Sequence, residues 1–79
     1  MSNAIHPILH FIPQTQVLLY KIDCTIKIRE KLMSMGIEEN ILVTILQGSK
    51  KNALVIIKRH NRRIMLRCNK NLNIFAKQK

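Results

Sequence analysis

The stretch Arg29-Glu30-Lys31-Leu32-Met33-Ser34-Met35-Gly36-Ile37 decides the fold, because the spacing of its apolar residues changes at the glycine. Ile28, Leu32 and Met35 recur at i, i+4 and i+7, which places them on one face of a helix. Gly36 stands where a helix commonly ends in a residue of left-handed conformation. The stretch therefore predicts one short helix whose apolar face packs on a core.

The residues before this helix predict a strand. Val17 to Ile22 is rich in apolar and aromatic residues, as strands usually are. Pro13-Gln14 favours a turn ahead of it. Thr25 or Asp23 can cap the helix, because a side-chain oxygen there accepts a hydrogen bond from a free backbone N–H group.

Four short apolar stretches follow the helix, and polar residues that favour turns separate them. His60-Asn61 favours a tight hairpin turn, because asparagine tolerates a positive φ. Five strands in so short a chain favour a closed or nearly closed barrel, which hides the sheet edges. We therefore predict a mainly β fold, a small five-stranded barrel with one short α-helix after the first strand. The four later strands are expected at Ile41 to Leu46, Leu54 to Ile57, Arg63 to Arg67 and Ile74 to Ala76.

The length of 79 residues limits the chain to one domain with a thin core. We expect residues 1–10 to form an N-terminal tail and residues 11–79 to form the domain. No run of about 20 apolar residues is present, so no transmembrane helix is expected. So short a chain can hardly enclose the deep cleft of a typical enzyme, and we expect a binding or regulatory module without catalytic residues.

The positive charge is concentrated in the second part of the chain. The protein has 14 basic and 4 acidic residues, a net charge of +10. Residues 1–49 are neutral overall, whereas residues 50–79 hold ten Lys and Arg and no acid. Such an excess attracts an acidic protein surface or nucleic acid, although it also serves simply to solvate a surface. The candidate partner-binding residues are Lys50, Lys51, Lys58, Arg59, Arg62 and Arg63.

The ordered set of motifs resembles the FeoA family, the ferrous iron transport protein A domains. The stretch from Arg29 to Ile37 is similar to the family's helix and its glycine stop. The other similar segments, over about residues 11–76, are Phe11-Ile12-Pro13-Gln14, Val43-Thr44-Ile45-Leu46, Arg63-Ile64-Met65-Leu66 and Ile74-Phe75-Ala76. They resemble the family's "L-x-P-G" turn, its "V-x-V" strand, its "R-I-A-L" strand and its closing strand. Asn61 and Gln14 replace glycines of the pattern, and Met65 replaces a small residue.

This resemblance implies an SH3-like barrel and a cytosolic accessory protein of bacterial ferrous iron uptake. The implied partner is the cytosolic G-protein domain of the membrane Fe(II) transporter, and membrane contact would occur only through that transporter. Two alternatives stay open. One is a small basic barrel that binds nucleic acid. The other is a stand-alone metal-responsive domain like the C-terminal domain of an iron-dependent repressor.

The candidate metal ligands are sparse. His6 and His10 lie four residues apart, but two ligands do not make a selective site. Cys24 and Cys68 are too few for a disulfide framework and are expected to be reduced thiols. With so few candidate ligands, the sequence predicts no cofactor and no tight Fe(II) site. The resemblance implies that Fe(II) is the ion that the pathway transports.

Overall fold

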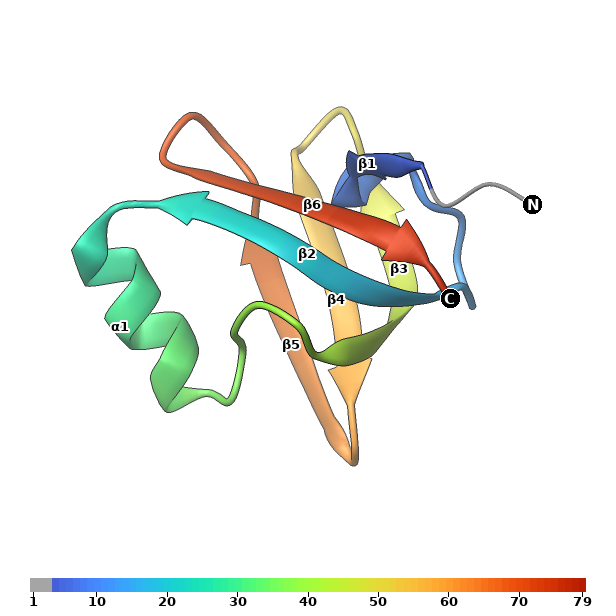
Figure 1. Ribbon diagram of the computed structural model, residues 1–79. Helices are drawn as coiled ribbons and strands as arrows, with labels where there is room; N and C mark the ends of the chain where they lie inside the picture. The colour runs from blue at the N-terminus through green and yellow to red at the C-terminus, as the bar shows by residue number, and fades with distance from the viewer. Residues whose placement is uncertain (1–3) are drawn as a thin grey trace.

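A computed structural model describes residues 4–79, which form one antiparallel sheet with a helix beside it (Figure 1). The strand order in the sheet is β1-β6-β2-β3-β4-β5. The strands are β1 (Ile5–Pro7), β2 (Gln16–Cys24), β3 (Leu42–Ser49), β4 (Leu54–Arg59), β5 (Arg62–Arg67) and β6 (Leu72–Gln78). The helices are the short 3-10 helix η1 (Ile8–His10) and the α-helix α1 (Ile26–Ser34).

The mainly β fold with one short α-helix is confirmed, although α1 follows the second strand rather than the first. The predicted closed or nearly closed barrel is not confirmed. The sheet ends at β1 on one side and at β5 on the other, and within residues 4–79 no ladder joins these two strands. The sheet curls around the core instead, and α1 lies beside β5 (Figure 1). The number of short strands therefore predicted the class of fold without deciding whether the sheet closes.

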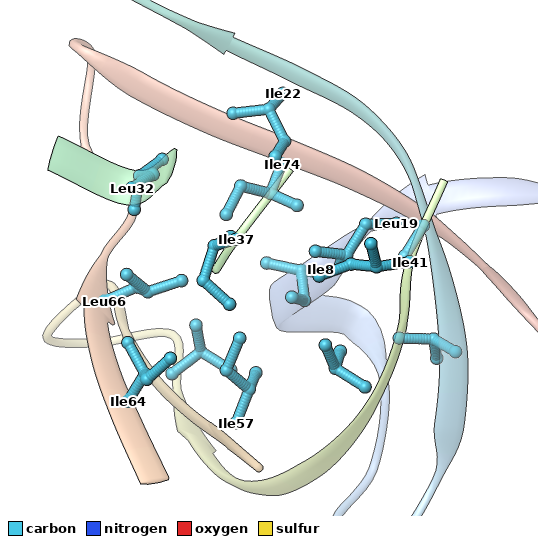
Figure 2. Close-up of a cluster of buried hydrophobic side chains, with 14 of the residues drawn as sticks. Ile8, Leu19, Ile22, Leu32, Ile37, Ile41, Ile57, Ile64, Leu66 and Ile74 are labelled. Atoms are coloured by element: carbon cyan, nitrogen blue, oxygen red, sulfur yellow. The ribbon is translucent and has the colours of Figure 1, made fainter. Parts of the chain in front are cut away.

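The sheet has six strands rather than five because residues near the start of the chain join it. Residues 5–10, expected to be part of a tail, form β1 and η1. β1 pairs with β6 in the register Ile5↔Lys77, and Ile8 of η1 is only 1% exposed within the core (Figure 2). Pro7 has no N–H to donate, and an edge strand tolerates this. Residues 1–3 of the expected tail lie outside the described residues.

Helix α1 begins and ends where the sequence predicts. The Thr25 hydroxyl oxygen accepts a hydrogen bond from the Ile28 N–H group at 3.3 Å, which caps the first turn. Gly36 has a φ of +82°, a conformation that glycine adopts without a steric penalty. Leu32 carries the apolar face of the helix into the core (Figure 2). No helix among the described residues has the length and apolar character needed to span a bilayer.

The core consists of aliphatic side chains from β2 to β6, from both helices and from the segment between α1 and β3, and among residues 4–79 it contains no polar side chain. Successive side chains of a strand point to opposite faces of the sheet, so every second residue of a strand faces the core. In the β4–β5 hairpin, the paired residues Val55↔Leu66 and Ile57↔Ile64 face inward. The hairpin turns at His60-Asn61 as predicted, although the positive φ of 57° belongs to His60.

The backbone of Ile22, in the middle of the sheet, lacks a strand partner on the side of β2 that faces β3. β2 pairs with β6 almost throughout, but it pairs with β3 only over Gln16–Leu18. At Ile22 the N–H group donates instead to the Glu39 carboxylate at 2.9 Å, and the carbonyl accepts a hydrogen bond from the Arg29 guanidinium. Arg29 Nη2 and Glu39 Oε2 are 3.9 Å apart. Two side chains therefore complete the pairing of β2 where β3 has left it.

We expect Glu39→Ala to lower the free energy of unfolding by about 1–3 kcal/mol, because it leaves the buried Ile22 N–H group without an acceptor. Urea unfolding followed by circular dichroism measures this change. Glu38→Ala is the matched control, because the neighbouring carboxylate is exposed. Equal stability of the two variants would show that the Glu39 hydrogen bond is unimportant.

Candidate functional site

The structure separates the six basic residues that the sequence groups as a partner-binding patch. Lys50 and Lys51 lie in the turn between β3 and β4, at the start of β4. The other four surround the β4–β5 turn at the opposite end of β4, and this turn lies at the bottom of Figure 1. β4 has six residues, so roughly 20 Å of strand separates the two groups.

The four residues of the hairpin are further divided between the two faces of the sheet. Lys58 pairs with Arg63, and Arg59 pairs with Arg62. Side chains alternate along a strand, so Arg59 and Arg62 share the face of the buried residues, at the end of the hairpin. Lys58 and Arg63 point to the opposite, outer face.

Arg59 has a structural role. Its Nη1 group donates a hydrogen bond to the Gly36 carbonyl, in the segment that follows α1. A side chain built at position 36 would place its Cβ 3.3 Å from the same Nη1 atom. The absence of a side chain at Gly36 therefore lets the guanidinium approach the chain closely. Of the six predicted residues, Arg59 is the one that the structure ties to another element.

The positive charge of the hairpin is not neutralised by carboxylates of the hairpin itself. Like charges directly opposite one another destabilise a strand pair, and Lys58↔Arg63 and Arg59↔Arg62 are both of this kind. The four acidic residues all precede β3: they are Asp23, Glu30, Glu38 and Glu39. An acidic partner at the hairpin would relieve this repulsion.

The two histidines named as candidate metal ligands lie in β1 and η1. The rings of His6 and His10 stack with centroids 6.5 Å apart, and Phe11 meets the His6 ring edge-on at 6.1 Å. Within residues 4–79, no three His, Cys, Asp or Glu side chains gather closely enough to hold a metal ion. His60 lies at the far end of the sheet, in the β4–β5 turn.

Both cysteines are free thiols and are partly buried. Burial raises the pKa of the Cys68 thiol to about 11. The neutral thiol is therefore the dominant form at physiological pH, and it packs against the core.

Sequence reasoning missed an apolar groove between α1 and β5. A hollow of about 230 Å³ lies there, lined mainly by side chains of the two elements. Ile28, Met35 and Met65 contribute its apolar surface. Met33 and Met65 are both exposed, but Met33 is not part of this lining. Helical periodicity identifies Met35 as inward-facing, and only the position of β5 shows that Met65 is its neighbour.

The curled sheet, the α-helix and the basic hairpin define a small, mainly β domain. A family model of the FeoA domain matches residues 10–75. The match covers most of the chain, so this protein belongs to the FeoA domain family, as the motifs predicted. Family membership connects it with ferrous iron transport. No curated protein and no solved structure matches the chain.

We expect Arg59→Gln to lower the free energy of unfolding by about 1–2 kcal/mol, because the Gly36 carbonyl loses a charged donor. Arg62→Gln is the matched control at the opposing position, and we expect it to change stability by less than about 0.5 kcal/mol. Chemical denaturation of both variants measures the difference. A loss in the Arg62 variant as large as that in the Arg59 variant would contradict the assigned role.

We expect native Cys68 to be alkylated by iodoacetamide about a hundredfold more slowly near pH 8 than in the urea-unfolded chain, because its pKa rises from 9.0 to about 11. The native rate should rise with pH until about pH 11. Mass spectrometry of a Cys24→Ser variant, which has Cys68 as its single thiol, measures both rates. Equal rates in the native and unfolded chains would contradict the effect of burial.

Proposed function

We propose that this protein is a cytosolic accessory module of ferrous iron uptake that docks on the G-protein domain of the membrane Fe(II) transporter. The match to the FeoA domain over residues 10–75 is the observation that carries this proposal. The role requires binding alone, and we assign no catalytic residue and no cofactor to the chain.

The docking surface that we propose is the end of the β4–β5 hairpin, on the face that it shares with the end of α1. Arg62 is exposed there, and its neighbour Arg59 is held against Gly36. The hydrogen bond from Arg59 fixes the hairpin relative to the helix, so Arg62 is presented on a rigid support. Because the repulsion between the two arginines is present before binding, an acidic surface on the G domain gains from relieving it.

The mechanism that we propose is a shift in the conformational equilibrium of the G domain. A ligand changes such an equilibrium only by binding one conformation more tightly than another. The module would therefore favour the nucleotide state whose surface presents acidic groups to Arg62. The stacking aromatics that single-stranded nucleic acids require lie elsewhere: Tyr20 lies under Lys77, and Phe11 lies beside His6. These positions favour a protein partner at the hairpin.

The test is a titration of the isotope-labelled protein with the cytosolic G domain, in its nucleotide-free and nucleotide-bound forms, followed by NMR. We expect contiguous shifts at the hairpin end and at Gly36. Arg62→Glu should weaken binding about tenfold, because it places a negative charge against an acidic surface.

Lys51→Glu is the control, because it makes the same change of charge at the other end of β4. Equal weakening by the two variants would remove the hairpin end from the interface. Absence of binding to every nucleotide form would contradict docking itself.

A further inference from the structure

The outer face of the β4–β5 hairpin combines apolar and basic side chains in a fixed order. Cross-strand pairing places Leu54 opposite Arg67, Ile56 opposite Met65, and Lys58 opposite Arg63. The apolar pair in the middle is therefore flanked by cations on both sides. We call these six residues the outer patch.

The apolar centre of the outer patch is accessible. Met65 is 64% exposed, and a hollow of about 190 Å³ beside it is lined by Leu54 and Ile56. The exposure of Met65 to water is unfavourable, because its side chain is flexible and apolar. Transfer of this side chain out of water would therefore be favourable.

The neighbouring strand adds no negative charge to this face. The residues of β3 that pair with the outer residues of β4 are Thr44, Gln47 and Ser49, which are all neutral. β4 and β5 contain no carboxylate, so Lys58, Arg63 and Arg67 are not countered by an acid on the face that they share. The outer patch is thus uniformly positive around an apolar centre.

We propose that the outer patch binds directly to the surface of an anionic phospholipid bilayer. Cations near such a surface gain from its negative potential, and an apolar side chain between them gains by entering the boundary of the acyl chains. Long basic side chains reach the phosphates while their stems cover apolar surface. A nucleic acid would satisfy the cations, but it offers no apolar environment to Met65.

The proposed membrane contact is independent of docking on the G domain, because alternation places the two surfaces on opposite faces. Arg62 lies on the inner face, and Met65 lies on the outer one. A molecule seated on the bilayer through the outer patch therefore keeps the inner face of its hairpin end, with Arg62, available to a protein partner.

The test is co-sedimentation of the purified chain with vesicles, without any transporter, at near-physiological salt. We expect binding to vesicles of phosphatidylcholine mixed with phosphatidylglycerol and much weaker binding to phosphatidylcholine alone. Arg67→Ser should weaken binding about fivefold, the effect of about one basic side chain at an anionic surface. Met65→Ser should weaken it several-fold without any change of charge.

Lys27→Ser is the matched control, because it removes one charge from α1, outside the outer patch. We expect its affinity for the vesicles to stay within about a factor of two of that of the parent protein, because an exposed charge outside the contact contributes little. NMR spectra of each variant show that the fold is intact.

Three results would overturn the proposal. The first is no binding to the anionic vesicles. The second is equal weakening by Lys27→Ser and Arg67→Ser, which would reduce the interaction to net charge. The third is a combined result: Met65→Ser leaves vesicle binding unchanged, and duplex DNA competes fully with the vesicles. That result would show that the outer patch binds polyanions in general. Broadening of the Met65 and Ile56 signals by spin-labelled lipid would support the proposed orientation.

Discussion

The hydrogen bonds at Ile22 are the constraint on which the arrangement of this domain depends. β2 lies in the interior of the sheet, so its peptide groups need partners on both sides, yet β3 accompanies it for only a few residues. Glu39 and Arg29 supply the missing acceptor and donor. Since Arg29 belongs to α1, the same contacts hold the helix against the sheet and allow Leu32 to reach the core.

The segment between α1 and β3 is consequently held at two points. Glu39 binds the edge of β2, and the Gly36 carbonyl accepts a hydrogen bond from Arg59 at the end of β4. These contacts join strands that do not lie next to one another in the sheet. A short irregular segment thus fixes the position of the β4–β5 hairpin relative to the helix. The hairpin surfaces are presented on a rigid frame for that reason.

The sequence predicted the features that depend on local chemistry. Helix α1, its Thr25 cap and its glycine stop follow from side chains within one or two turns, and the motifs identified the family. Features that depend on distant pairing were missed. β1 is only three residues long and contains Pro7, so it carried no periodic signal. The sequence did not predict that the sheet stays open or that the six basic residues lie in separate groups, because both features depend on where the strands end. The role of Glu39 was not predicted either, because nothing local in the sequence reveals that the backbone of Ile22 lacks a partner in β3.

The open sheet has a consequence for how copies of this chain meet. β5 ends the sheet, and an unpaired strand edge is a template on which another chain can add a strand. Three of its six residues are arginines: Arg62, Arg63 and Arg67. Two such edges brought together would place these charges side by side, which opposes their pairing. The arginines at the hairpin thus also oppose the association of the molecule with itself through this edge.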